Sequence, residues 1–351
     1  LRLPRPGLAP AVTRHRKLRV AVLMHEDLVP PDDLSGLEDK EVARFKTEYD
    51  VVAGLTELGH EVLKLGVWDE LAPLRRALQE REPHIVFNLL EEFHGRAVYD
   101  HNVVSYLELK GVPYTGCNPR GLVLARDKAL SKKILHFHRL NVPAFAVVPL
   151  GRRLRRPKSL TFPLIVKSLI EEASLGISQA SVVHNDEKLA ERIRFIHERV
   201  GTDSIVEQYI EGRELYVGVL GNHRLTVLPA WELRFERLPA DAVPIATRKV
   251  KWDPATQERW QVYIQESDLA GDDRRKIERT AKKIYRILGL SGYARIDFRL
   301  DRDGRLFFLE ANPNPDIAAE SEFPSSGESA GMTYEEILQR LLTLGLHRAG
   351  H

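Results

Sequence analysis

The chain has 351 residues, of which 43% are hydrophobic and 29% are charged, and its formal net charge is +2. Its length allows a sizeable core and two or three domains, while the near-neutral charge argues against duplex nucleic acid or an anionic membrane as a partner. One cysteine, Cys117, excludes an internal disulfide framework, and no segment approaches the roughly 20 apolar residues of a membrane span. We therefore expect a cytoplasmic enzyme or binding protein, with a frayed N-terminal segment over residues 1–17.

The first predicted domain, residues 18–119, alternates apolar strands with amphipathic helices. Strands are predicted over 18–24, 61–65 and 85–88, and helices over 42–58 and 72–80. This alternation is typical of a parallel sheet that is covered by helices, so the fold class expected for this part is α/β.

The second predicted domain, residues 120–210, contains a segment suited to phosphate. Helices are predicted over 127–138 and 187–199, and strands over 144–148, 162–167 and 204–210. Lys167 ends a strand and is followed by a serine- and glycine-containing loop, where backbone amides can approach an anion. The loop lacks the glycine-lysine-serine run of a P-loop, and an ordinary surface loop is the alternative.

The third predicted domain, residues 211–351, begins with a strand over 214–220 that Glu211 and Gly212 join to the preceding strand. A long polar loop follows over 239–263, and its length makes it a candidate lid. A helix is predicted over 272–288, and the segment after it has the pattern of a β-hairpin.

The predicted hairpin spans residues 293–312 and has Asp303-Gly304 at its tip. Asp-Gly between two strand-like runs favours a two-residue turn, which would pair Arg302 with Arg305. The same count sets Asp297 opposite Glu310.

Counting further sets Arg295 opposite Asn312, so that these four polar residues share one face of the hairpin. Two opposed carboxylates repel each other, and a divalent cation such as Mg²⁺ would resolve the conflict, with the asparagine as a further oxygen ligand. The alternative is a solvated charged face on which Arg295 and Arg299 neutralise the acids. The other face is predicted to be core, formed by Ala294, Ile296, Phe298, Phe307, Leu309 and Ala311.

Seven segments, in this order, resemble landmarks of the ATP-grasp superfamily and, within it, of the D-alanine–D-alanine ligases. They are residues 88–91, 112–116, 127–128, 165–167, 207–214, 294–298 and 309–315. The resemblance covers about residues 18–346. It implies an ATP-grasp fold with α+β character in the ATP-binding half, preceded by a Rossmann-like parallel-sheet domain. The family joins a carboxylate to an amine through an acylphosphate and forms ADP.

The resemblance also implies a role for each matching residue. Lys128 and Lys167 correspond to the lysines that hold ATP phosphates, and Ser174 and Gly176 lie in the segment that resembles the flexible phosphate-covering loop. The adenine-edge and ribose positions correspond to Glu207, Ile210 and Glu214.

The catalytic and metal positions can be matched in the same way. Lys251 corresponds to the lid lysine near the γ-phosphate, and Arg295 to the arginine that steadies the acylphosphate and tetrahedral states. The Mg²⁺ ligands, for which Mn²⁺ is an alternative ion, correspond to Asp297, Glu310 and Asn312. Ser321 corresponds to the contact with the carboxylate of the second substrate.

Two departures from the family pattern argue against D-alanyl-D-alanine as the product, and a third, at Asp316, concerns the acceptor pocket. The first strand lacks the glycine- and serine-rich turn, so Glu26 is only a loose substitute for the glutamate that binds the first amino group. The serine pair of the phosphate loop has become Ala173-Ser174, and the glycine after the metal-site proline is Asp316. Acidic residues near Ser321 suggest a substrate with an amino or guanidino group, whereas the alternative is an exposed acidic loop.

The sequence therefore predicts an ATP-dependent ligase that acts on small-molecule carboxylate and amine substrates. A regulatory ATP-binding protein and an ATP-grasp phosphotransferase are the alternatives. Arg295 and Lys251 disfavour the regulatory alternative, because binding alone needs neither. Family members often dimerise through the N-terminal domain, so a homodimer is an expectation that the residues themselves do not establish.

Overall fold

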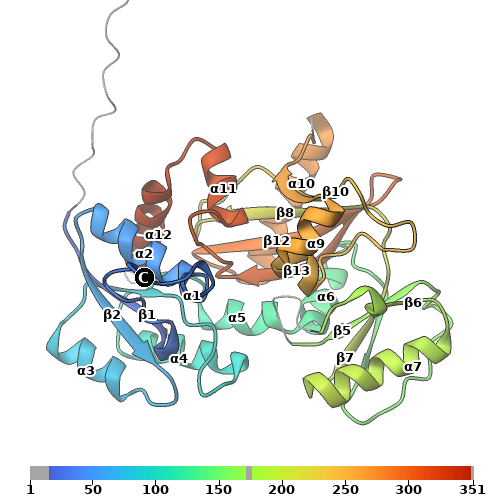
Figure 1. The fold of residues 1–351 in the computed structure, drawn as a ribbon, viewed down its shortest axis with the longest axis horizontal. Coiled ribbons are helices and arrows are strands. Elements are labelled where there is room, and N and C mark those ends of the chain that lie inside the picture. The colour runs from blue at the N-terminus through green and yellow to red at the C-terminus, as the bar shows by residue number, and fades with distance from the viewer. Residues whose placement is uncertain (1–15, 171–175, 270, 349–351) are drawn as a thin grey trace, which may run out of the picture.

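The computed structural model describes residues 16–170, 176–269 and 271–348, and it contains three sheets in three consecutive parts of the chain (Figure 1). The predicted loop residue Ser174 and most of the predicted frayed segment 1–17 lie outside the described residues. No helix among the described residues is long and apolar enough to cross a membrane.

The strands are β1 Arg19–His25, β2 Glu61–Val67, β3 Ile85–Asn88, β4 Phe145–Val148, β5 Leu164–Ser168, β6 Val182–Val183, β7 Ser204–Gln208, β8 Arg213–Leu220, β9 Thr226–Val227, β10 Trp231–Phe235, β11 Val262–Glu266, β12 Tyr293–Leu300 and β13 Leu306–Pro313. The α-helices are α1 Asp39–Val42, α2 Lys46–Glu57, α3 Ala72–Glu80, α4 Asp100–Leu109, α5 Pro119–Arg126, α6 Lys128–Phe137, α7 Asp186–Phe195, α8 Arg248–Trp252, α9 Pro254–Trp260, α10 Gly271–Ile287, α11 Glu322–Ser329 and α12 Tyr334–Arg348. Short helical turns are η1 Glu26–Leu28, η2 Ala97–Tyr99, η3 Gln179–Ser181 and η4 Ile196–Val200.

The N-terminal sheet has the order β2-β1-β3, and all of its strands are parallel, as the sequence predicts. Five consecutive residues of β1 are buried, because helices cover both faces of the sheet. One face packs against α2 and the C-terminal helix α12, and the other against α3 and α4 (Figure 1). The end of the chain therefore covers the sheet that its beginning forms. The predicted helix 42–58 is interrupted, since α1 and α2 are separate.

The central sheet has the order β4-β7-β5-β6 and is antiparallel. Alternation along β5 sends Leu164 and Val166 into the core beneath α7, while Ile165 belongs to a different cluster with Ile245. The face opposite α7 is thus turned toward the segment after β10.

The C-terminal sheet has the order β11-β10-β8-β12-β13, with β9 paired to β8. Helix α10 packs on the face that carries Val217, Ile296 and Phe298. Strands β7 and β8, which are consecutive in the chain, belong to different sheets. Gly212 permits this crossing, because its φ is +155° and an added Cβ would lie 2.1 Å from the Leu300 carbonyl oxygen.

The connection between β12 and β13 differs from the predicted two-residue turn. Leu300 pairs with Leu306, and residues 301–305 form the connection, which is closed by a hydrogen bond from the Asp301 amide to the Arg305 carbonyl oxygen. A β-bulge then leaves Leu309 unpaired, and beyond it Asp297 pairs with Glu310, as predicted.

The bulge also corrects the predicted core face of the hairpin. Leu306 and Phe308 are buried in the core, whereas Phe307 and Leu309 are only partly buried. The extra residue reverses the alternation, because side chains on the two sides of the bulge fall out of phase.

The predicted polar loop 239–263 is only partly irregular. It contains the short helices α8 and α9 and ends in the first residues of β11. Thr247 caps α8 by accepting a hydrogen bond from the Val250 amide at 3.2 Å, and Pro254 begins α9.

Candidate functional site

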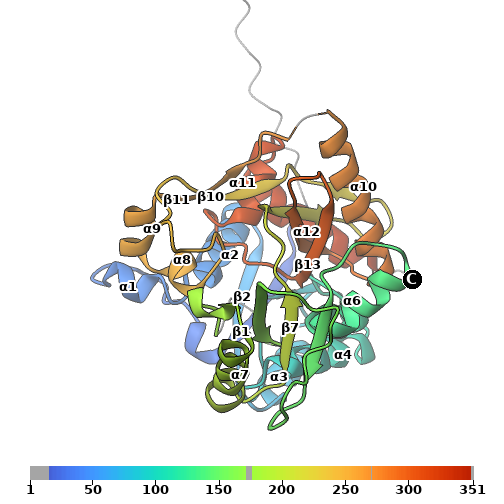
Figure 2. The same ribbon diagram turned by 90° about the vertical axis from the view of Figure 1, so that its right-hand side faces the viewer.

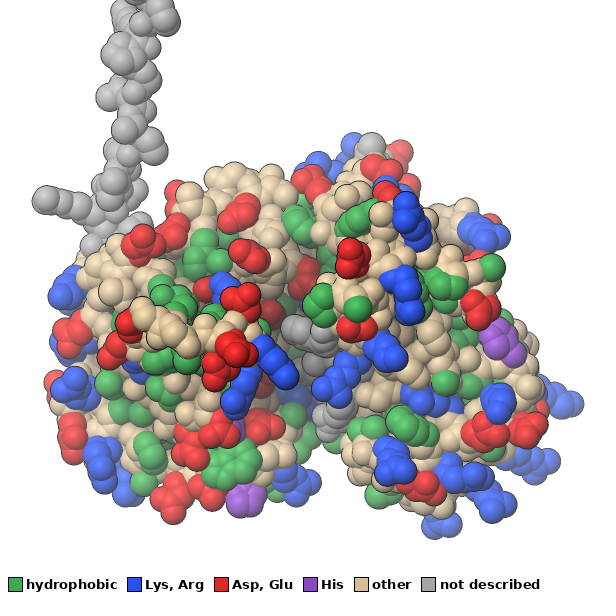
Figure 3. Space-filling model, in the orientation of Figure 1, with side chains coloured by type: hydrophobic (Ala, Val, Ile, Leu, Met, Phe, Trp, Pro, Cys, Tyr) green, Lys and Arg blue, Asp and Glu red, His purple; other side chains and the backbone are tan. Residues whose placement is uncertain are grey.

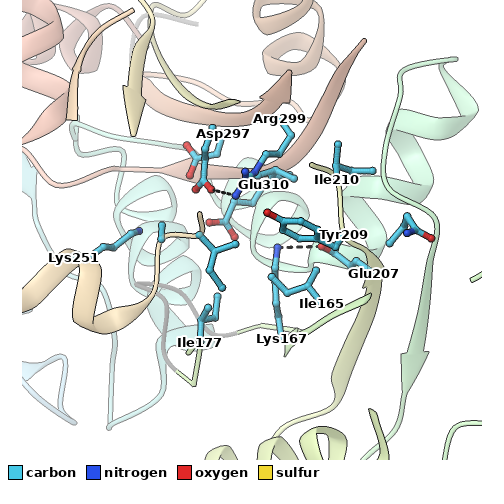
Figure 4. Close-up of a pocket in the computed structure, with 15 residues that line it drawn as sticks. Ile165, Lys167, Ile177, Glu207, Tyr209, Ile210, Lys251, Asp297, Arg299 and Glu310 are labelled. Atoms are coloured by element: carbon cyan, nitrogen blue, oxygen red, sulfur yellow. Dashed lines mark hydrogen bonds and ion pairs between the residues drawn. The ribbon is translucent and has the colours of Figure 1, made fainter. Parts of the chain in front are cut away.

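A cleft lies between the central and C-terminal sheets (Figure 4). Seven of the residues singled out in the sequence line it, namely Lys167, Glu207, Ile210, Glu214, Lys251, Asp297 and Glu310. The remaining lining residues are Ile165, Ile177, Gln208, Tyr209, Ile245, Ala246, Arg299 and Leu309.

The Glu207 carboxylate on β7 is held by two lysines. Lys167 on β5 donates a hydrogen bond to Oε2 at 3.1 Å (Figure 4). Lys132 on α6 forms an ion pair with Oε1 at 2.8 Å. Burial alone would raise the pKa of Glu207, but the two ammonium groups outweigh this effect and lower it. The carboxylate is therefore ionised and fixed at the wall of the cleft.

Lys132 was not identified from the sequence, although it lies one helical turn after Lys128 on α6. Its side chain is fully buried, and it also donates a hydrogen bond to the carbonyl oxygen of Leu309, the bulge residue of β13. Seen from the side, α6 lies close to both β7 and β13 (Figure 2). Lys132 thereby connects the two sheets that form the cleft.

Asp297 on β12 accepts two hydrogen bonds from Arg295, at 2.8 and 2.9 Å. Asn312 on the paired strand donates to Asp297 Oδ2 at 3.0 Å, so the predicted face does bring these side chains together. Burial raises the pKa of Asp297, and Arg295 opposes that rise. Arg295 also lies 4.9 Å from the centre of the Tyr216 ring, which fixes its plane.

Glu310 lies among basic groups. Lys128, which is 4% exposed, lies 3.5 Å from Glu310 Oε2. Burial would raise the pKa of Glu310, but Lys128, Lys167 and Lys251 together outweigh it and lower the value. The two carboxylates thus have different surroundings, since Asp297 contacts an arginine and Glu310 lies among lysines.

The donor set of this pair fits Mg²⁺ bound together with a nucleotide. The described residues hold no group of three or more histidine, cysteine, aspartate or glutamate side chains that could bind a metal ion. Two adjacent carboxylates and an asparagine oxygen are, however, sufficient when phosphate oxygens and water complete the shell, as is usual for Mg²⁺. Asp297, Glu310 and Asn312 are therefore the residues that could hold the ion.

Glu214 on β8 is engaged by its neighbours. It forms an ion pair with Arg299 at 2.6 Å and accepts a hydrogen bond from the Tyr216 hydroxyl at 3.0 Å. Arg299 also donates to the carbonyl oxygens of Gly212 and Pro244. Arg299, which the sequence suggests only as a counter-charge to the metal-site acids, instead anchors the segment before α8 to the cleft wall.

Of the two residues predicted in the phosphate-covering loop, Gly176 is described by the structure. Gly176 has a φ of +73°, and its carbonyl oxygen accepts a hydrogen bond from Arg192, so this end of the loop is tied to α7. Ser174 lies outside the described residues. Lys251, on α8, lines the cleft on the opposite side from Lys167 (Figure 4).

The three predicted substrate residues are not among those that line this cleft. Ser321 donates to the carbonyl oxygens of Asp316 and Ala318, at 2.9 Å each, and Asp316 accepts from Thr47 on α2. Glu26 is exposed in η1, which follows β1. The space-filling view shows a hollow between the N-terminal and central parts, with lysine and arginine side chains on both sides of it and acidic side chains on the N-terminal side (Figure 3).

Comparisons with known proteins agree with this architecture. The family model described as the D-ala D-ala ligase C-terminus matches residues 138–343. The D-alanine–D-alanine ligase of Desulfotalea psychrophila is 32% identical over 266 residues, covering 75% of this chain and 78% of the relative. The uncharacterized protein y4sG of Sinorhizobium fredii is 33% identical over 304 residues, covering 85% and 87%.

Solved structures show the same fold. The D-alanine–D-alanine ligase of Bacillus anthracis superposes with a TM-score of 0.74 at 21% identity, covering 95% of this chain and 99% of that one. The VanG D-Ala:D-Ser ligase of Enterococcus faecalis gives a TM-score of 0.67 at 18% identity, covering 94% and 99%. The family model spans more than half of the chain, and the chain therefore belongs to the D-alanine–D-alanine ligase-like family of ATP-grasp ligases.

Proposed function

We propose that this protein forms an amide or peptide bond between two amino-acid-like substrates through an acylphosphate, with release of ADP and phosphate. The observation that carries this proposal is the pairing of Asp297 with Glu310 on neighbouring strands, with Arg295 hydrogen-bonded to Asp297. Lys167 and Lys251 line the same cleft. Binding of ATP alone needs no arginine fixed next to the carboxylate pair, as Arg295 is by Asp297. The cleft offers positive charge on both sides of the position where phosphate would lie.

The first step requires a substrate carboxylate oxygen to attack the γ-phosphorus while the bond to the β–γ bridging oxygen breaks and ADP leaves. Both reactants are anionic, so the barrier falls only if fixed positive charges face them. Lys128, Lys167 and Lys251 supply that charge in our proposal. Mg²⁺, held by Asp297, Glu310 and Asn312, would neutralise phosphate charge when bound.

The second step requires the amine nitrogen of the other substrate to attack the acyl carbon. The bond from that carbon to the phosphate oxygen breaks, phosphate leaves and the nitrogen loses a proton. The guanidinium of Arg295, fixed by Asp297 and Tyr216, is suited to stabilise the negative charge that develops on the acyl oxygen. No serine or cysteine nucleophile is needed.

The substrates are proposed to differ from two D-alanines. Asp316 stands where the family has a glycine, and Glu26 is exposed on η1 rather than buried at the cleft. A solved protein of the same fold is described as a D-Ala:D-Ser ligase, so this fold accommodates more than one second substrate. The cytoplasmic location and the homodimer stay predictions.

The proposal is tested by ADP release with ATP and Mg²⁺ over pairs of D- and L-amino acids, followed by mass spectrometry of the products. ADP release that depends on both partners, with a product lighter by one water, supports the ligase. ADP release without condensation favours the phosphotransferase, and ATP binding without turnover favours a regulatory protein. Glu310→Gln is the variant expected to be inactive in this assay. Its matched control is Glu328→Gln, which makes the same change at an exposed position of α11.

A further inference from the structure

The first turn of α2 contacts the loop that follows the predicted metal strand. The Thr47 hydroxyl donates to Asp316 Oδ1 at 2.8 Å, and the Ala319 amide donates to Asp50 Oδ2 at 2.9 Å. This loop begins directly after β13, which carries Asn312, and ends at Ser321. A helix of the N-terminal part is thus in contact with the segment between the predicted metal site and the predicted acceptor residue.

Glu48, next to Thr47, is a buried acid without a basic partner. It is 6% exposed and lies on the face of α2 that also carries Val51 and Leu55, both 0% exposed. Among the described residues no other side chain forms a hydrogen bond or ion pair with its carboxylate. Lys46 is already committed, because its ammonium group contacts both oxygens of Asp50, at 2.6 and 2.5 Å.

A second acid makes this position still less favourable for an unpaired charge. Burial raises the pKa of Glu48 to about 7, and repulsion from Asp316 adds to the rise. The backbone amide of Glu48 opposes the rise only in part. A buried carboxylate without a cationic partner is costly, so either a proton or a cationic group must neutralise it. Asp316 itself is exposed to solvent.

We propose that Glu48 and Asp316 together bind a cationic group, an ammonium or a guanidinium, on one of the two ligase substrates. The inference rests on the proposed function and names the substrate class that it uses. Glu48 provides a desolvated carboxylate, at which a hydrogen-bonded cation gains most, and Asp316 provides the solvent-facing one. The loop that carries Asp316 joins the predicted metal strand to Ser321, the predicted acceptor residue.

The test compares lysine with norleucine, which has nearly the same side chain without the ammonium group. Binding of D- and L-lysine and of D- and L-norleucine is measured by calorimetry in the presence of ADP and Mg²⁺. The same amino acids are then tested as substrates by ADP release and mass spectrometry. We expect one enantiomer of lysine to bind at least about tenfold more tightly than its norleucine counterpart, a difference of roughly 1.4 kcal/mol.

Three variants assign that preference to the proposed residues. Glu48→Gln and Asp316→Asn should each reduce the lysine preference about tenfold while leaving norleucine binding within about twofold. Glu57→Gln makes the same chemical change at an exposed position of the same helix and should leave both ligands unaffected. Asp316→Asn keeps the test decisive if Glu48→Gln alters folding, because Asp316 is exposed.

The outcomes separate this inference from the proposed function. Condensation of uncharged amino acids with no preference for lysine, or a preference that survives both variants, would overturn the cation site and leave the ligase standing. Binding of lysine that depends on Glu48 and Asp316, without condensation of any pair, would support the site and count against the ligase. If Glu48 is only protonated and binds no ligand, the Glu48→Gln and Asp316→Asn variants should bind lysine and norleucine like the wild type. That result would also overturn the cation site.

Discussion

The Lys132 ammonium group lies 2.8 Å from Glu207 Oε1 and is completely buried. Desolvation by burial lowers the pKa of Lys132, and Glu207 opposes that effect. The other carboxylate oxygen contacts Lys167, so the acid is shared between a lysine in the cleft and a lysine behind it. Because Lys132 also contacts Leu309, displacing it would disturb the cleft wall on both sheets.

Replacing Lys132 by methionine should destabilise the protein by about 3 kcal/mol, because it leaves Glu207 with one cation at a buried position. It should also raise KM for ATP more than it lowers kcat, since the lysine has no exposed surface with which to touch substrate. Urea unfolding and steady-state kinetics measure the two effects. Lys133→Met, at the exposed neighbouring position of α6, is the control, and an equal loss in both variants would refute the role.

Replacing Glu310 by glutamine should lower turnover by on the order of 100-fold or more, because a metal-ligand charge worth several kcal/mol of transition-state stabilisation is removed. The variant should keep the fold, since Glu310 lies outside the apolar clusters. Activity is measured over a Mg²⁺ titration, with circular dichroism as the check on folding. Near-normal ADP release by a folded variant would contradict the metal assignment.

Replacing Arg295 by lysine tests the bidentate geometry. A lysine keeps the charge but cannot donate two parallel hydrogen bonds to Asp297. We expect kcat to fall by about 100-fold, which corresponds to the loss of one oxyanion donor, while ATP binding changes by less than a few-fold. Arg302→Lys makes the same change at an exposed position on the hairpin connection. Unchanged kcat in Arg295→Lys would remove the arginine from the mechanism.

Glu48 should make stability depend on pH. Its pKa is about 7 in the folded protein and near its ordinary value of 4.5 when unfolded, so the native state binds more protons between these values. The free energy of unfolding must then fall as pH rises from 4.5 to 7, by about 3 kcal/mol for this group. Urea unfolding of wild type and Glu48→Gln at pH 4.5 and 8 measures it.

The two variants should differ in how their free energy of unfolding changes between pH 4.5 and 8. Glu48→Gln should gain stability relative to wild type between the two pH values, because glutamine has no charge to desolvate. Glu57→Gln should run parallel to wild type, since that position is exposed. Parallel curves for Glu48→Gln would show that the folded and unfolded pKa values of this carboxyl are alike.

The sequence by itself determined the elements whose pattern is local. The apolar run of β1, the amphipathic helix α3 and the parallel character of the first sheet follow from periodicity, because strands and helices bury alternate or every third to fourth residue. The opposition of Asp297 and Glu310 was also predicted, although for a reason that is only partly correct. The predicted turn was too short, and the bulge at Leu309 restored the pairing.

Only the tertiary structure decided which charges meet across sheets. Lys132 reads in the sequence as one more lysine on a helix, but it is buried against β13, which is far away in the chain. The sequence also gives no sign that Glu48 is buried or that its neighbour Thr47 contacts Asp316. Arg299 likewise serves Glu214 rather than the metal-site acids. Periodicity specifies which face of an element is buried, but the partner that meets that face is selected by packing between segments distant in the chain, which local pattern does not encode.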